Sequence, residues 1–145
     1  MRRISANTPG RHLELVVDMS SPTILVVDDE PLIRWSVAET LADSGYRVKE
    51  AGDARSALQA MAVPGTQTDA VLLDLWLPDS QNLTALSAIR DMSPTTPVIV
   101  MTAHGTDDLS KDARSRGAFM TLQKPFDMSV LLPLVEAAVA SSRAH

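Results

Sequence analysis

Five side chains in this sequence have the types and the spacing that a phosphoryl-transfer site would need. Asp28 and Asp29 follow the apolar run TILVV, and Asp74 lies inside the apolar run AVLLDL. Thr102 ends the run PVIVMT, and Lys124 follows the run FMTLQ. A charge inside an apolar run is costly to bury without a partner, so Asp74 in particular requires a cation or hydrogen-bond donors close by.

The chemistry of these groups predicts a magnesium site. Three carboxylates that converge repel one another, and the pKa of at least one is then raised. Mg²⁺ relieves this repulsion, because it prefers oxygen ligands such as carboxylates, waters and a phosphate oxygen. An aspartate can also attack phosphorus to give an acyl phosphate, while a lysine and a hydroxyl stabilise charge on the phosphoryl oxygens. We therefore expect Asp28, Asp29 and Asp74 to bind Mg²⁺, and Thr102 and Lys124 to face a phosphoryl group.

Each of these residues also has an ordinary structural interpretation. An Asp-Asp pair after a strand is usually a turn or a helix cap. A threonine at a strand end is most often a β-former, and a lysine before a proline is usually a surface residue. The functional interpretation depends on all of them reaching the same edge of one sheet in chain order.

The elements that would position these residues alternate between strands and helices. The runs TILVV, AVLLDL and PVIVMT are apolar on both faces, as in the central strands of a parallel sheet, whereas YRVKEA alternates like a strand nearer an edge. FMTLQ is a more ambiguous fifth strand. Such a repeat indicates a doubly wound α/β domain, in which ligands bind at the carboxyl ends of the strands. The segments between and after the strands predict helices over about 31–45, 53–61, 81–92, 106–117 and 127–140.

Composition and length exclude several classes of protein. The 145 residues suffice for one domain with a hydrophobic core. The lack of cysteine excludes disulfides and thiolate metal sites. The net charge is −5 and the Lys and Arg residues are scattered, which argues against direct nucleic-acid binding. No apolar run approaches the roughly 18 residues that a membrane span requires, so we expect a cytoplasmic protein without membrane contact.

Four motifs, VVDDEP, LLDLWLPD, VIVMTAHG and LQKPF, resemble in order and spacing those of the receiver domain of two-component response regulators. VIVMTAHGT and QKPFD are most similar to NtrC-type receivers, which precede σ54-dependent activator ATPase modules. The resemblance implies the CheY-like, flavodoxin-like (βα)5 fold with strand order 2-1-3-4-5. It divides the chain into a flexible N-terminal extension over 1–22, a receiver domain over 23–141 and a tail over 142–145.

The same resemblance implies a function in phosphorelay signal transduction. Asp74 would accept a phosphoryl group from a sensor histidine kinase or a histidine phosphotransfer protein. The domain would then switch a protein-interaction face, and it would not be a turnover enzyme. Mg²⁺ would bind Asp28, Asp29, Asp74 and the backbone carbonyl of Trp76.

Further expectations come with the resemblance. Thr102 and Lys124 would form the phosphate-sensing pair, and the bond between Lys124 and Pro125 would be cis. A homodimer would form through the face made by the fourth helix, the fifth strand and the fifth helix. An output domain for transcription regulation would lie outside this chain.

Three features depart from the family pattern or from regular structure. Thr121 occupies the strand position that is usually aromatic, which argues against the usual rotamer switch. The predicted fourth helix is unusually polar, with only Leu109 and Ala113 facing inward; it is either a solvated helix or a mobile helix that binds a partner or a second copy. Pro133 predicts either a late start near Ser129 or a bend in the last helix.

Trp76 and His104 should border the mouth of the site. A bulky indole there would hinder the water that attacks an acyl phosphate, so we hypothesise slow autodephosphorylation; alternatively, Trp76 only packs on the surface. A haloacid-dehalogenase-like phosphatase also uses an aspartate nucleophile and Mg²⁺, but it needs a second acid where this chain has Trp76. A pseudo-receiver that works only as an interaction or dimerisation module is the alternative function.

Overall fold

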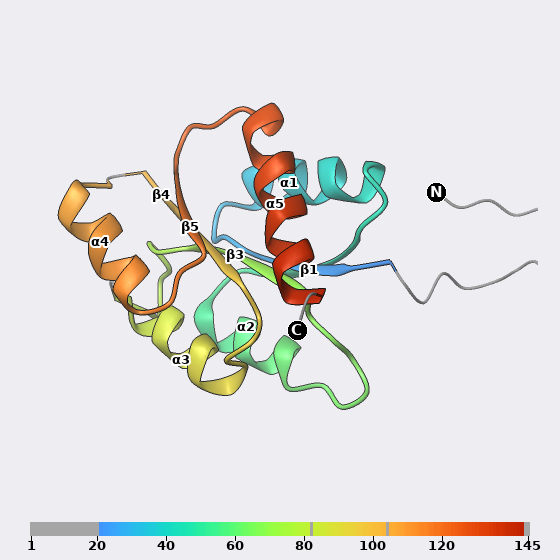
Figure 1. The fold of residues 1–145 in the computed structure, drawn as a ribbon, viewed down its shortest axis with the longest axis horizontal. Helices are drawn as coiled ribbons and strands as arrows, with labels where there is room; N and C mark the ends of the chain where they lie inside the picture. Colours follow the sequence, from blue (N-terminus) through green and yellow to red (C-terminus); the bar gives the residue numbers. More distant parts are fainter. Residues whose placement is uncertain (1–20, 82, 104, 144–145) are drawn as a thin grey trace, which may run out of the picture.

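The computed structural model describes residues 21–81, 83–103 and 105–143, in which strands and helices alternate (Figure 1). The predicted N-terminal extension therefore lies almost entirely outside the described residues, and so does His104. The strands are β1 (Thr23–Val27), β2 (Arg47–Ala51), β3 (Ala70–Asp74), β4 (Val98–Thr102) and β5 (Met120–Gln123). The helices are α1 (Pro31–Asp43), α2 (Ala54–Met61), α3 (Thr84–Met92), α4 (Asp107–Ser115) and α5 (Met128–Arg143).

The strands form one parallel sheet in the order β2-β1-β3-β4-β5. This order confirms the predicted doubly wound, flavodoxin-like α/β fold. The β2 strand, whose sequence alternates, lies at an edge as predicted, and the ambiguous fifth strand forms the other edge. Because all pairings are parallel, the carboxyl ends of β1, β3, β4 and β5 reach the same edge of the sheet.

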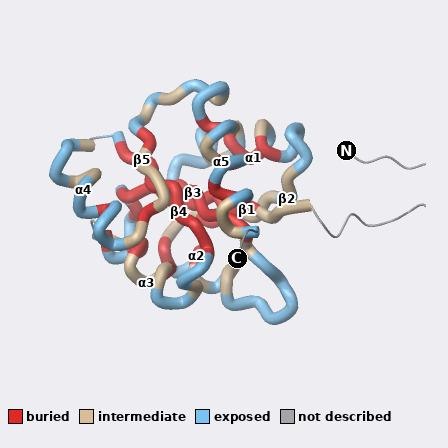
Figure 2. The backbone as a smooth tube through the Cα atoms, viewed as in Figure 1, coloured by how far each residue is buried: buried red, intermediate tan, exposed pale blue. Residues whose placement is uncertain are grey.

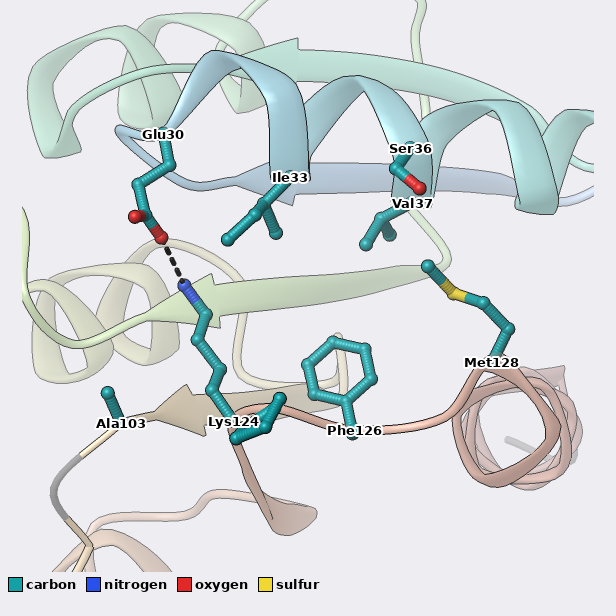
Figure 3. A pocket seen from close by; sticks show the side chains of 9 residues that line it. Glu30, Ile33, Ser36, Val37, Ala103, Lys124, Phe126 and Met128 are labelled. Carbon is teal, nitrogen blue, oxygen red and sulfur yellow. Dashed lines mark hydrogen bonds and ion pairs between the residues drawn. The ribbon is translucent and has the colours of Figure 1, made fainter.

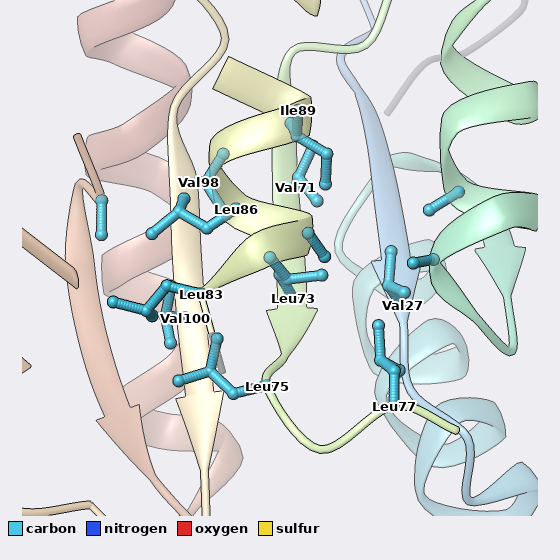
Figure 4. Packing of buried hydrophobic residues seen from close by; sticks show 14 of the residues in the cluster. Val27, Val71, Leu73, Leu75, Leu77, Leu83, Leu86, Ile89, Val98 and Val100 are labelled. Carbon is cyan, nitrogen blue, oxygen red and sulfur yellow. The ribbon is translucent and has the colours of Figure 1, made fainter. Parts of the chain in front are cut away.

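Helices cover both faces of the sheet, with α1 and α5 on one side and α2, α3 and α4 on the other (Figure 1). Alternate residues of the central strands β1, β3 and β4 belong to two separate cores: Leu25 and Val27 of β1 pack toward α2 and α3, whereas Ile24 and Val26 pack toward α1 and α5. The central strands are therefore buried along their length (Figure 2), and Figure 4 shows the first of these cores. Full burial of each such aliphatic side chain contributes about 1.5–3 kcal/mol, which makes the strand ends rigid supports for a site.

Local signals explain where most helices begin. Pro31 is the first residue of α1, where its missing N–H is harmless. The side chain of Asp53 accepts a hydrogen bond from the Ser56 N–H and caps α2. Thr106 caps α4 in the same way through the Leu109 N–H. Both caps agree with the predicted helix starts.

Two helices differ from the predicted ranges. The α3 helix begins at Thr84, about three residues late, because the segment before it forms a turn with a bridge between Leu77 and Ser80. The α5 helix begins at Met128, within one residue of the predicted late start, and continues to Arg143. Pro133 still lies inside α5, beyond the first turn.

The polar α4 helix has the predicted inward pair. Ala113 is fully buried, and Leu109 is partly buried against the same core. The remaining residues of α4 are exposed or half-buried. Among the described helices, none combines the length and the apolar character needed to cross a bilayer.

Candidate functional site

The predicted site residues meet at the carboxyl edge of the sheet. Asp28 directly follows β1, Asp74 is the last residue of β3, Thr102 is the last residue of β4, and Lys124 directly follows β5. Asp28, Asp74 and Thr102 are almost completely buried, whereas Asp29 is exposed at the mouth. The topology thus brings together all of the side chains that the sequence singled out here.

Lys124 joins the acids through its ammonium group. Its Nζ lies 2.7 Å from Asp28 Oδ2, 3.2 Å from Asp74 Oδ2 and 3.4 Å from Glu30 Oε1. Glu30 was not among the predicted site residues, although the motif VVDDEP places it directly after the two aspartates. One half-buried ammonium is therefore shared among three carboxylates.

The three aspartates also lie close enough to share one cation. Carboxylate oxygens of Asp28, Asp29 and Asp74 lie within 4.8 Å of one another. The donor set consists only of oxygens and carries three negative charges, which fits a hard divalent ion such as Mg²⁺. The Trp76 N–H donates to Asp74 Oδ1 at 3.0 Å, while the role of the Trp76 carbonyl as a metal ligand stays a prediction.

The electrostatics of the cluster agree with an incompletely neutralised site. Burial raises the pKa of the Asp74 carboxyl, and the nearby charge of Asp28 raises the pKa further. The Trp76 N–H and Lys124 offset only part of this rise. Burial alone would lower the pKa of the Lys124 ammonium, but its contacts with Asp28 and Asp74 raise that pKa above the ordinary value. A second cation among the acids would remove the remaining repulsion.

The main chain also connects Thr102, at the end of β4, to Lys124, directly after β5. The Lys124 N–H donates to the Thr102 carbonyl at 2.8 Å, and the peptide bond between Lys124 and Pro125 is cis, as the resemblance implies. A Cβ atom at Gly105 would come within 2.9 Å of Thr102 Cγ2. Only glycine therefore lets this loop pass so closely over the threonine.

The mouth of the site is a surface cavity of about 500 Å³. Asp29, Glu30, Asp74, Trp76, Ala103 and Lys124 line it. Trp76 is 50% exposed and does border the mouth, as predicted.

A second cavity of about 490 Å³ adjoins the first (Figure 3). The two cavities share Glu30, Ala103 and Lys124. The walls of the second are mostly apolar, and in Figure 3 Ile33 and Val37 of α1 face Phe126 and Met128 across it. This cavity was not predicted, because it depends on how α1 and the loop after β5 pack together.

The loop that follows Asp74 is attached to a neighbouring helix. Asp79 accepts hydrogen bonds from the Ala54 and Arg55 N–H groups at 2.8 and 3.0 Å, at the start of α2. This long-range cap was missed, since LWLPDS shows only a turn.

Thr121 of β5 stands at the position that is usually aromatic. Its Oγ1 lies 3.4 Å from Ser110 Oγ of α4, so this residue makes a polar contact with the helix.

The fold and the site define a class of α/β signalling domains with an acidic pocket at the carboxyl edge of the sheet. The model of the response regulator receiver domain family matches residues 24–136. The chain therefore belongs to the receiver domain family of response regulators, the proteins of two-component signalling.

Curated relatives are consistent with this family. The chain is 36% identical over 125 residues to the DNA-binding transcriptional regulator NtrC of Proteus hauseri, covering 86% of this chain and 26% of the relative. It is 37% identical over 121 residues to the transcriptional regulatory protein PdtaR of Mycobacterium tuberculosis H37Rv, covering 83% of this chain and 58% of the relative. The chain thus spans about a quarter to somewhat over half of the length of these relatives.

Solved structures agree with the fold. The receiver domain of NtrX from Brucella abortus is 38% identical with a TM-score of 0.74, and the match covers 81% of this chain and 98% of that structure. A CheY-like receiver domain from Methanospirillum hungatei JF-1 is 25% identical with a TM-score of 0.80, covering 86% and 98%.

Proposed function

We propose that Asp74 accepts a phosphoryl group from a histidine kinase or a histidine phosphotransfer protein, with Mg²⁺ bound by Asp28, Asp29 and Asp74. The observation that carries this proposal is the convergence of three aspartate carboxylates within 4.8 Å around an ammonium that contacts two of them. A purely structural ion pair would not need three acids for one lysine, because the excess charge lowers stability.

The chemistry follows from the positions of the groups. A carboxylate oxygen of Asp74 forms a bond to phosphorus while the bond from phosphorus to the donor's imidazole nitrogen breaks. Lys124, already 3.2 Å from Asp74 Oδ2, would then pair with a phosphoryl oxygen, and the Thr102 hydroxyl would donate to another. When bound, Mg²⁺ would neutralise charge on the phosphoryl oxygens.

The apolar cavity supports a docking site for the phosphodonor. A donor histidine must reach Asp74 through the mouth, and the apolar cavity shares three wall residues with that mouth. Ile33 of α1 belongs to the wall of this cavity and is 36% exposed. A donor helix with apolar side chains would therefore fit along α1 and the loop that carries Phe126.

The output is a signalling state rather than a released product. A phosphoryl group adds about −1.5 to −2 charges at Asp74. Thr102 and Lys124 would move toward it, and the loops after β3 and β4 would follow, which biases an interaction face. In this account the chain is a phosphoacceptor and not a turnover enzyme. The homodimer through α4, β5 and α5 stays a prediction.

Incubation with acetyl phosphate and Mg²⁺, followed by intact mass measurement, tests the proposal. We expect a mass gain of one phosphoryl group that is lost in Asp74→Asn and in EDTA. Asp69→Asn is the matched control, because Asp69 is a buried aspartate outside the cluster, directly before the other end of β3, and this variant should be phosphorylated normally. If neither acetyl phosphate nor any phosphohistidine donor modified the wild-type chain, the pseudo-receiver function would replace this proposal.

A further inference from the structure

Arg34 of α1 lies beside the acid cluster and connects two chain segments. Its Nη1 donates to the backbone carbonyl of Asp28 at 2.7 Å, and its Nε donates to Glu50 Oε1 of β2 at 3.1 Å. The Arg34 side chain is only 22% exposed, so the first of these bonds is largely shielded from water. A charge-assisted hydrogen bond of this kind is stronger than one between neutral groups.

The bond to the Asp28 carbonyl fixes the peptide that joins two of the three acids. The Asp28 N–H donates to the Ala51 carbonyl at 3.1 Å, and Asp28 Oδ1 accepts from the Glu30 N–H at 2.9 Å. Asp28 is thus held at its amide, its carbonyl and its carboxylate. Since Asp29 begins at the same peptide, the orientation set by Arg34 also decides where the exposed second carboxylate lies.

The chain leaves space for this guanidinium group. A Cβ atom at Gly52, just after β2, would come within 3.2 Å of Arg34 Nη1. Such a contact is tight enough that the guanidinium or the strand end would have to shift. The glycine thus allows Arg34 to lie between the end of β2 and the acid loop.

We propose that Arg34 is a positioning residue: it holds the Asp28–Asp29 peptide in the orientation that lets the acid cluster bind a divalent cation. This inference rests on the proposed function, because it concerns the same metal site. Arg34 does not touch the reacting atoms, and it acts through the main chain of Asp28.

Glu50 has a separate part in this arrangement. The positive charge of Arg34 repels a divalent cation, which opposes the gain from holding the peptide. The ion pair with Glu50 offsets that charge while the hydrogen bond to the carbonyl remains. Loss of the hydrogen bond and loss of the neutralising charge should therefore both weaken cation binding, but only the second effect should decrease at high salt.

Arg90 provides a matched control. Its Nη1 donates to the Thr96 carbonyl at 2.8 Å, and this bond spans six residues, as the bond from Arg34 to Asp28 does. Arg90 also lies against a glycine, since a Cβ atom at Gly117 would come within 2.7 Å of Arg90 Nε. It belongs to α3 and binds the loop before β4, at the opposite edge of the sheet from the acids.

The test is a Mg²⁺ titration of the unphosphorylated chain. The fluorescence of Trp76, in a Trp35→Phe background, is the signal that reports binding. Arg34→Met keeps a good helix former and should weaken Mg²⁺ binding about tenfold, the lower end of the effect of groups that orient metal ligands. Arg34→Lys should fall between Met and the wild type, because an ammonium can still donate to the carbonyl. Arg90→Met should bind Mg²⁺ as the wild type does.

Glu50→Gln should also weaken binding, and its effect should disappear in high salt, whereas the effect of Arg34→Met should persist. Equal Mg²⁺ affinities for Arg34→Met and the wild type would overturn the role of Arg34 and leave the proposed function standing. If the wild-type chain showed no Mg²⁺-dependent fluorescence change, or one that persisted in Asp74→Asn, the metal site itself would be refuted. Unfolding curves in EDTA separate both outcomes from a variant that fails to fold.

Discussion

Asp69 directly precedes β3 and Asp74 ends it; each is 3% exposed, but their surroundings differ in kind. Asp69 accepts from the Thr23 N–H at 2.8 Å and from Gln67 Nε2 at 3.0 Å, and Arg143 Nε lies 3.8 Å away. These partners are all donors. Asp74 instead shares its one ammonium with other acids, and its remaining neighbours include two more aspartates.

The difference teaches that burial alone does not mark a reactive acid. A buried carboxylate whose lone pairs meet donors is part of the structure, because its charge is compensated. Burial, and then the nearby charge of Asp28, raise the pKa of the Asp74 carboxyl, which the rest of the fold holds in place, as is common at functional sites. Over the length of β3 and the residue before it, the fold therefore separates a structural aspartate from a functional one.

The largest expected effect on stability is at Asp69. Asp69→Ala would leave the half-buried Thr23 N–H without this partner and should lower the free energy of unfolding by about 1–3 kcal/mol. Asp74→Asn should change stability in the opposite direction when divalent ions are absent, since it removes one of the converging charges. Urea unfolding in EDTA measures both changes.

Asp91→Ala, at an exposed position of α3, is the control for the loss of an aspartate, with an expected change within about 0.5 kcal/mol. Similar losses of stability in Asp69→Ala and Asp74→Asn would abolish the distinction between the two buried acids.

The sequence predicted one of these aspartates and missed the other for a physical reason. Asp74 lies inside an apolar run, where its charge is conspicuous. Asp69 follows the polar stretch TQT, where an acid looks solvated. Its burial depends on a hydrogen bond to Thr23, 46 residues away, which no local pattern reveals.

The same division applies to the fold and to the rest of the site. Strands that are apolar on both faces and helices with local caps could be predicted within a residue or two, because their signals are local. The late start of α3, the attachment of Asp79 to α2 and the network of Arg34 depend on packing between distant segments. The acid cluster was predictable because parallel topology alone brings strand ends together.

A pH series sharpens the comparison through the titration of Asp74. Burial raises its pKa above the usual value near 3.8, so the folded chain binds a proton there more readily than the unfolded chain does. The charge therefore lowers stability at neutral pH, and this penalty disappears as the pH falls through the raised pKa. The stability advantage of Asp74→Asn over the wild type in EDTA should be greatest near neutral pH and should shrink on acidification. If the difference in free energy of unfolding between Asp74→Asn and the wild type stayed constant across this range, the charge of Asp74 would not be what lowers the stability of the wild type.

The smallest effect concerns water access at the Asp74 end of β3, where the site opens to solvent through the mouth beside Trp76. The indole is 50% exposed and belongs to the wall of the cavity, so it stands where water would approach an acyl phosphate on Asp74. Trp76→Ala should speed the loss of the phosphoryl group several-fold. The loss is measured by intact mass at intervals after the donor is removed.

Trp35→Ala is the matched control, because Trp35 is 57% exposed on α1 and does not line the mouth. The Trp76 N–H that donates to Asp74 belongs to the main chain and is kept in the alanine variant, so a faster loss would report shielding by the ring. An unchanged rate in Trp76→Ala would mean that the indole only packs on the surface and that the lifetime of the phosphoryl group is set by the buried groups around Asp74.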